Sequence, residues 1–196
     1  GAIRFGFAGI KNVGAGAIEA ILETRDAEGP FKSLFDFADR VDARRVNRRV
    51  VEALVKCGAF DSLHPARASV WASIDGALER AASLQRDRAV GQANLFGGLG
   101  EESGLDQPRL AEAGDWSERE RRSHEKELLG CYVTGHPLSA VAPLLSRFTD
   151  TTALATAGKR GRDVRGGGLL TGLRETRTRR GQRMGFGQLE DLEGGF

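Results

Sequence analysis

The chain has 196 residues, 40% of them hydrophobic, and a formal net charge of +2, so it holds enough apolar material for one large domain or two to three small ones. No run approaches the roughly 18 to 20 apolar residues of a membrane span, and residues 1–10 lack the basic-then-apolar pattern of a signal peptide. Cys57 and Cys131 have no spacing typical of a disulfide framework. We therefore expect a soluble, cytoplasmic protein with reduced thiols and no membrane partner. Because the first residue is not Met, we also expect a piece of a longer protein.

Hydrophobic spacing predicts that most of the chain is helical. Ile18, Ile21 and Leu22 form one face of a helix that follows the turn IKNVGAG. The other predicted helices cover residues 31–40, residues 46–57 up to a cap at Gly58, residues 66–88, and residues 116–129 with a capping box at Ser117 and Glu120. The pattern predicts two successive helix-turn-helix units within about the first 60 residues.

The chain changes character after Phe148, where glycine and arginine become frequent. Alternating residues predict three β-strands, with a hairpin turn at Arg179-Arg180-Gly181. Three strands do not close a five-stranded barrel, so we expect an incomplete one. Between residues 151 and 189 the sequence has nine basic and only two acidic residues. Such a block is typical of a solvated face, but together with a second basic patch it suggests a polyanionic partner. The nine are Lys159, Arg160, Arg162, Arg165, Arg174, Arg177, Arg179, Arg180 and Arg183.

Motifs for catalysis are missing or incomplete. Gly9 and Gly14 have the spacing of a P-loop, but Ala15-Gly16 stands where Lys and Ser or Thr are required. The glycines at 166–168 open no helix, which argues against a dinucleotide site. The three histidines have no metal-ligand spacing with either cysteine. We expect no catalytic residue, metal site or cofactor in this chain.

The stretch GIKNVGAGAIEAI is the most specific signal in the first half. A helix entered through a glycine-rich hairpin presents backbone N–H groups at its positive end, where a phosphodiester can bind. Glycine allows close approach, and a lysine adds charge. The alternative is an ordinary tight turn between helices. The candidate DNA-binding residues are Lys11, Asn12, Val13, Gly14, Ala15 and Gly16.

Four arginines cluster at the start of the third predicted helix, away from its apolar stripe. Arg44, Arg45, Arg48 and Arg49 lie at positions i, i+1, i+4 and i+5 and can contact phosphates without reading sequence. The alternative is a solvated helix end whose arginines form ion pairs with the nearby acidic residues Asp42 and Glu52.

The segment GQANLFGGLGEESG, residues 91–104, has the composition of a flexible linker. Its two large apolar residues, Leu95 and Phe96, must be buried against something, either this protein or another.

At this point a family resemblance becomes clear. Four segments occur in this order: GIKNVGAGAIEAI, FKSLFDFADRVDARRVNRRVVEALVKCGAFDSL, WSERERRSHEKELLGCYVTGHPL and TRRGQRMGFGQLEDLEG. This order resembles the C-terminal half of the alpha subunits of bacterial DNA polymerase III, from end to end of the chain. The expected fold is mainly α with a small β part. The expected domains are a tandem helix-hairpin-helix domain (1–64), an amphipathic helix (65–90), a flexible linker (91–115), a helical connector (116–150) and an incomplete, three-strand OB-fold (151–196).

The resemblance implies that the hairpin at 12–16 grips the duplex backbone and that the basic strands face single-stranded template. Electrostatic contacts are expected from Arg177, Arg179, Arg180 and Arg183. Phe186 is the one aromatic candidate for stacking, and we expect it inside the barrel. The catalytic palm of this nucleotidyltransferase, with its aspartates and Mg²⁺, would lie upstream, so the chain alone is expected to be non-catalytic.

The resemblance also assigns the linker. Gln92, Ala93, Asn94, Leu95 and Phe96 resemble the internal clamp-binding peptide of these polymerases, with the Leu-Phe pair as buried anchors. The implied partners are duplex DNA, single-stranded template, the sliding clamp (beta subunit) and other replicase subunits. The hypothesis is a DNA-holding, clamp-tethering segment that supports processive replication. The alternatives are the same segment of an error-prone C-family polymerase, a stand-alone nucleic-acid adaptor, or a linker whose Leu-Phe pair packs on its own protein.

Overall fold

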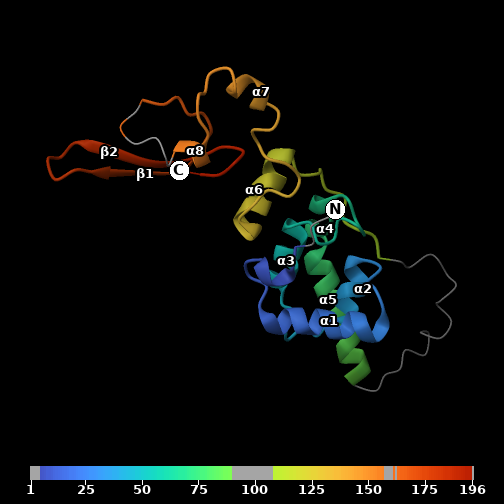
Figure 1. Ribbon diagram of the computed structural model, residues 1–196. Helices are drawn as coiled ribbons and strands as arrows, with labels where there is room; N and C mark the ends of the chain where they lie inside the picture. Colours follow the sequence, from blue (N-terminus) through green and yellow to red (C-terminus); the bar gives the residue numbers. More distant parts are fainter. Residues whose placement is uncertain (1–4, 90–107, 157–160, 162, 196) are drawn as a thin grey trace. The chain divides into compact units, whose positions relative to one another are not determined.

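The structure is a computed structural model that describes residues 5–89, 108–156, 161 and 163–195 (Figure 1). Its contacts divide the chain into two compact units, Gly1–Tyr132 and Val133–Phe196. The division falls just after the long helix that the sequence predicts at residues 116–129.

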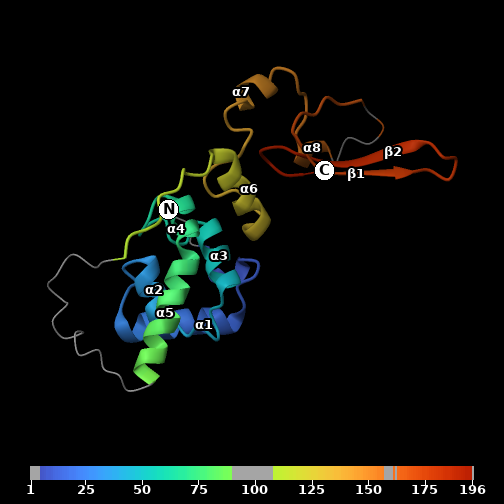
Figure 2. The ribbon, with the colours of Figure 1, turned by 180° about the vertical axis from the view of Figure 1, so that it is seen from behind.

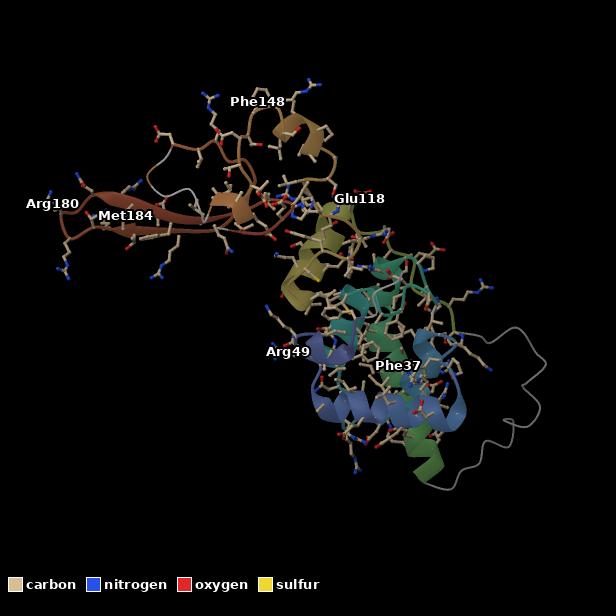
Figure 3. All side chains as sticks on the ribbon, in the orientation of Figure 1. Phe37, Arg49, Glu118, Phe148, Arg180 and Met184 are labelled. Carbon is tan, nitrogen blue, oxygen red and sulfur yellow. The ribbon has the colours of Figure 1, made fainter. Side chains whose placement is uncertain are left out.

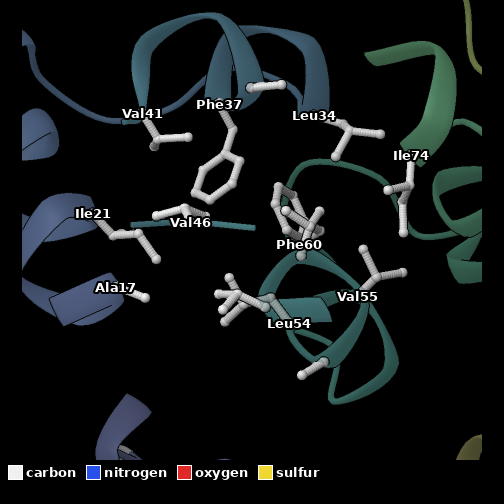
Figure 4. Close-up of a cluster of buried hydrophobic side chains, with 14 of the residues drawn as sticks. Ala17, Ile21, Leu34, Phe37, Val41, Val46, Leu54, Val55, Phe60 and Ile74 are labelled. Atoms are coloured by element: carbon white, nitrogen blue, oxygen red, sulfur yellow. The ribbon is translucent and has the colours of Figure 1, made fainter. Parts of the chain in front are cut away.

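The first unit is helical. Its elements are the 3₁₀ turn η1 (Phe7–Gly9) and the helices α1 (Ala15–Glu28), α2 (Leu34–Arg40), α3 (Arg48–Lys56), α4 (Arg67–Ala72), α5 (Ile74–Ala89) and α6 (Glu118–Leu129). α2 and α5 lie side by side in both views (Figures 1 and 2). One core joins these helices, and the close-up shows Ile21, Phe37, Leu54 and Phe60 meeting inside it (Figure 4).

Local sequence signals set several helix ends as predicted. The capping box is confirmed, since the Glu120 amide donates to Ser117 Oγ at 3.3 Å and the Ser117 amide donates to Glu120 Oε2 at 2.8 Å. Gly58 has φ of 85° just after α3, a conformation that favours glycine. These helix ends depend only on residues within a few positions of them, which explains why the sequence alone identifies them.

The helix predicted over residues 66–88 is wrong in one respect, because it is two helices that meet at Ser73. The Ser73 hydroxyl donates to the Ser69 carbonyl at 2.7 Å and accepts the Ala111 amide at 2.7 Å. Leu110 packs against the core beside this bond. The end of the predicted flexible linker is therefore held against α4 and α5 by contacts with residues about forty positions earlier.

A buried ion-pair network fastens α6 to the rest of the first unit. Arg67 is 3% exposed and Glu125 is fully buried, and their Nη1 and Oε1 atoms lie 3.0 Å apart. Arg67 also donates to both carboxylate oxygens of Asp61. Burial lowers the pKa of the Arg67 guanidinium, but the hydrogen bonds and charges of Asp61 and Glu125 more than offset this and raise its pKa. Arg67 is therefore a charged group inside the unit.

Within its described residues, the second unit contains two short helices and one β-hairpin. These are α7 (Ala142–Leu145), α8 (Ala153–Thr156), β1 (Leu169–Arg177) and β2 (Arg183–Glu190). The strands are antiparallel, with an irregularity between Thr171 and Arg174 where Gly172 has φ of 61°. The Asp191 carboxylate joins the hairpin to α8, accepting the Ala153 amide at 2.6 Å and the amides of Glu193 and Gly194.

The predicted fold class, mainly α with a small β part, is confirmed. The described part of the chain forms two strands where three were predicted, followed by an isolated bridge between Glu190 and Gly195. The predicted turn at 179–181 is confirmed, with Gly181 at φ of 79°. Such a hairpin is consistent with a partial OB-fold. None of the described helices is long and apolar enough to cross a membrane.

Replacing Glu125 by Ala tests the buried network. We expect the free energy of unfolding to fall by about 3–5 kcal/mol, because Arg67 would remain buried without one of its partners. Urea denaturation followed by circular dichroism measures the loss. Glu127→Ala is the control, since Glu127 is exposed on the same helix. Equal, small losses for both variants would show that the network contributes little.

Candidate nucleic-acid interface

The hairpin predicted to contact DNA is a tight turn whose first and last residues have buried side chains. Ile10 and Val13 belong to the core, and the Val13 amide closes the turn on the Ile10 carbonyl at 3.2 Å. Between them Lys11 and Asn12 are exposed. Asn12 has φ of 69°, a left-handed conformation that asparagine tolerates better than most residues. The buried residues on either side and the hydrogen bond across the turn therefore fix the backbone of the exposed residues.

α1 begins directly after this turn with uncapped backbone amides. Gly14 is the N-cap, and its carbonyl accepts the amides of Ala17 at 3.0 Å and Ile18 at 3.1 Å. No side chain caps the helix and its first turn has no acidic residue. Among the described residues, the amides of Ala15 and Gly16 find no backbone acceptor. These N–H groups stand at the positive end of a 14-residue helix, where an anion is stabilised.

Nothing inside the described chain requires glycine at positions 14 and 16. Gly14 has an ordinary φ of −79°, and Gly16 lies within α1. A Cβ atom at either position would meet nothing within 4 Å. At position 16, inside α1, glycine costs helix stability relative to alanine. With no Cβ at these two positions, the backbone beside the amides of Ala15 and Gly16 is open to close approach, as the sequence predicts for a phosphodiester.

The second hairpin repeats the first with a different chemistry. The buried residues Val46, Val50 and Leu54 recur 33 positions after Val13, Ala17 and Ile21. In place of Gly14, Asn47 is the N-cap, and its Oδ1 accepts the Val50 amide at 3.2 Å. Arg48 and Arg49 stand where the first hairpin has Ala15 and Gly16. At the start of α3, one backbone amide is therefore bonded to the capping side chain, and two arginines occupy the first two helical positions.

The four predicted arginines of this hairpin divide into two pairs. Arg45 binds Glu19 and Glu23 of α1, each at 2.8 Å, and Arg48 binds Asp75 at 2.8 Å and Glu52 at 3.3 Å. Ion pairing, the alternative reading of this cluster, thus applies to half of it, mostly with acidic residues distant in sequence. The side chains of Arg44 and Arg49 are exposed and make no ion pair with any described residue. Arg49 is labelled in Figure 3. These two remain available for phosphates.

Sequence reasoning missed the residues that hold the first hairpin in place. The Lys11 amide donates to the Leu128 carbonyl of α6 at 2.9 Å. Leu128 follows Glu125 by one helical turn, so the buried Arg67 network fixes the helix end that the hairpin contacts. The Ser117 capping box predicts α6 but gives no signal for its packing partner.

The basic β-hairpin brings the other predicted arginines together at one end. Arg177 lies directly opposite Arg183, and Arg180 is in the connecting turn (Figure 3). The Thr178 amide donates to the Gln182 carbonyl at 2.9 Å and closes the turn around Arg179 and Arg180. All four arginines are exposed, and none forms an ion pair within the part of the chain that the structure describes. They can contact a polyanion together.

Phe186 differs from its prediction. It was expected inside a barrel, but its side chain is 56% exposed. Two strands enclose no interior, so the described residues offer nothing to cover it.

The predicted clamp-binding residues, Gln92, Ala93, Asn94, Leu95 and Phe96, lie outside the residues that the structure describes. In the described part of the chain, no group of three or more His, Cys, Asp or Glu side chains could hold a metal ion.

Comparison with known proteins agrees with this geometry. A family model described as helix-hairpin-helix motif matches residues 1–70. DNA polymerase III subunit alpha of Vibrio cholerae is 40% identical over 195 residues. The chain resembles a segment of that subunit. The Escherichia coli K12 and Mycobacterium leprae proteins of the same name are 38% and 34% identical. Each match covers 99% of this chain, which spans 17% of the length of these relatives.

Replacing Gly16 by Ala separates DNA binding from stability. We expect the free energy of unfolding to rise by up to about 1 kcal/mol, because alanine favours a helix, while the affinity for duplex DNA falls because the new methyl group blocks backbone approach. Urea denaturation and fluorescence anisotropy with a labelled duplex measure the two effects.

The matched control is Gly76→Ala in α5. A Cβ at Gly76 also meets nothing within 4 Å, so this variant should gain stability without losing DNA affinity. If Gly16→Ala binds duplex as tightly as Gly76→Ala, the hairpin backbone is not a contact.

Proposed function

We propose that this chain is the DNA-holding and clamp-tethering segment of a replicative DNA polymerase III alpha subunit, acting in the bacterial cytoplasm. The observation that carries the proposal is the first hairpin, where the amides of Ala15 and Gly16 have no backbone acceptor among the described residues and no side chain of residue 14 or 16 covers them. Similarity over 99% of the chain to proteins named DNA polymerase III subunit alpha supports the same conclusion. The replicative form is preferred to an error-prone paralogue or a stand-alone adaptor because the relatives cited above all carry that name.

Duplex DNA would be held at its backbone, without sequence readout. The amides of Ala15 and Gly16 would donate hydrogen bonds to the oxygens of one phosphate, as helix N-termini do. Arg44 and Arg49, with Lys11 beside the first hairpin, would supply charge to others. The single-stranded template would contact the arginines at the tip of the β-hairpin.

The sliding clamp would bind residues 92–96, with Leu95 and Phe96 filling an apolar pocket and Gln92 bonding at its rim. Glycines on both sides of this peptide give it reach. A weak contact is enough, since a ring around DNA turns each dissociation into local rebinding. This supports processive synthesis by a complete polymerase whose palm, Mg²⁺ and other subunits would lie outside this sequence.

Removing the two unpaired arginines should weaken duplex binding mainly at low salt. For Arg44→Ala/Arg49→Ala we expect the slope of log K against log [salt] to become smaller by about 1.8, since each phosphate contact contributes about 0.9. Anisotropy titrations at several salt concentrations give the slope.

The control for these titrations is Arg25→Ala/Arg86→Ala, which removes the same charge. Arg25 lies ten residues along α1 from Ala15, about 15 Å from the free amides. Equal slopes for the two double variants would mean that overall charge, and not these contacts, governs binding.

The clamp contact is tested by replacing both anchors. We expect Leu95→Ala/Phe96→Ala to abolish binding of the chain to a purified bacterial sliding clamp, measured by surface plasmon resonance, because the pocket loses both apolar side chains. Leu99→Ala/Leu105→Ala removes two apolar side chains from the same linker and should leave binding intact. A wild-type chain that does not bind the clamp would favour the error-prone or adaptor reading.

A further inference from the structure

One exposed face of α1 begins at the candidate phosphate site and then carries two acidic residues. Ala15, Glu19 and Glu23 follow one another at intervals of four residues, so they lie on the same face of the helix, and all three are exposed. Glu19 is about 6 Å along the helix axis from Ala15, whose amide has no backbone acceptor among the described residues. Carboxylates at such distances repel a phosphate. The two glutamates therefore oppose DNA binding at the first hairpin.

Arg45, from the turn of the second hairpin, is shared between these two carboxylates. Its Nη2 atom lies 2.8 Å from Glu19 Oε2, and its Nη1 atom lies 2.8 Å from Glu23 Oε2. Like charges four residues apart on a helix repel each other, and a guanidinium between them relieves the repulsion. The three side chains together still carry a net negative charge, because one guanidinium faces two carboxylates.

The position of this ion pair distinguishes Arg45 from Arg48, the other paired arginine of the second hairpin. Arg48 pairs with Asp75 of α5 and with Glu52 of its own helix, so neither of its partners is on α1. The partners of Arg45 are on the face of α1 that starts at the free amides. Arg44, the preceding residue of the turn, is exposed and has no ion pair among the described residues. Arg45 thus lies between two groups that we assign to phosphates.

The ion pairs of Arg45 are open to water and can be exchanged. The side chains of Glu19 and Glu23 are 66% and 68% exposed, and that of Arg45 is 33% exposed. Exposed ion pairs contribute little stability, because water and salt screen the attraction. A guanidinium binds phosphate with the same planar fork that it uses for carboxylate. Contact with a DNA phosphate gains in addition from the release of counterions that condense on DNA.

We propose that Glu19 and Glu23 are an intramolecular competitor of duplex DNA. They hold the Arg45 guanidinium in the free protein, and in the complex a backbone phosphate takes their place, next to the phosphate at the amides of Ala15 and Gly16. This rests on the proposed function, because it needs the first hairpin to bind duplex. It adds a DNA contact that the ion pairs conceal in the free protein. The glutamates keep the affinity moderate, and weak backbone contacts allow a protein to slide along DNA.

The test replaces both carboxylates by neutral amides of the same shape. The full 196-residue chain is titrated with a labelled duplex at several salt concentrations and followed by fluorescence anisotropy. Glu19→Gln/Glu23→Gln should bind duplex about 2- to 30-fold more tightly than the wild type, because two exposed ion pairs no longer have to be broken. Glu79→Gln/Asp87→Asn is the matched control, since it removes two exposed negative charges from α5, and it should change the affinity much less.

A further variant shows whether Arg45 becomes a DNA contact. Adding Arg45→Ala to Glu19→Gln/Glu23→Gln should cancel the gain in affinity. It should also reduce the slope of log K against log [salt] by about 0.9, which is the contribution of one phosphate contact. Urea denaturation of the same variants should give free energies of unfolding close to that of the wild type, because the ion pairs they remove are exposed.

The possible failures are distinguishable. If Glu19→Gln/Glu23→Gln binds no more tightly than Glu79→Gln/Asp87→Asn, the glutamates do not compete with DNA and the proposal is overturned. If the gain appears but survives Arg45→Ala with an unchanged slope, the glutamates only repel DNA and the exchange is overturned. In both cases the duplex-holding function stands, because the wild type still binds. If neither the wild type nor any variant binds duplex, that function is overturned together with the exchange.

Discussion

The buried ion pair between Arg67 and Glu125 joins α6 to the rest of the helical unit. It joins residues 58 positions apart in sequence and lies where water does not reach. Two charges in such a place are stable only when their hydrogen bonds are satisfied, and Arg67 meets this by also binding Asp61 and the Lys56 carbonyl. Because Glu125 is on α6, the network makes that helix a fixed part of the helix-hairpin-helix unit.

The position of the first hairpin, which we propose to contact DNA, follows from this. One helical turn after Glu125, the Leu128 carbonyl accepts the amide of Lys11. The hairpin is thus tied at its exposed residue to α6 and at its base to the core through Ile10 and Val13. A backbone that must present N–H groups to a phosphate gains from being held in advance, since less freedom is lost on binding.

The two hairpins share the same spacing of buried residues but differ in the groups that they expose. Both enter a helix through a buried valine, Val13 or Val46. In the first hairpin no side chain caps the helix and glycine occupies the N-cap. In the second, the Asn47 side chain caps the helix and arginines follow it. Arg45 and Arg48 form ion pairs with α1 and with Asp75, so their charges are already partnered by other helices. The basic cluster that the sequence shows as one feature therefore has both a structural and a DNA-binding part in our proposal.

The sequence by itself determined the features that depend on neighbouring residues. These are the helical stripes, the Ser117 capping box, the glycine after α3, the 179–181 turn and the glycine-rich hairpin before α1. Each is fixed within a few positions, where side-chain spacing and backbone preference act directly. The fold class followed from them.

Only the tertiary structure decided which side chains meet across the chain. It divided the predicted 66–88 helix at Ser73, whose hydroxyl accepts the amide of Ala111. It paired Arg45 with Glu19 and Glu23, leaving Arg44 and Arg49 available, and it placed Phe186 beside Arg174 on an open face. Such pairings join residues far apart in sequence. No local pattern encodes them, because they depend on how whole helices and strands pack.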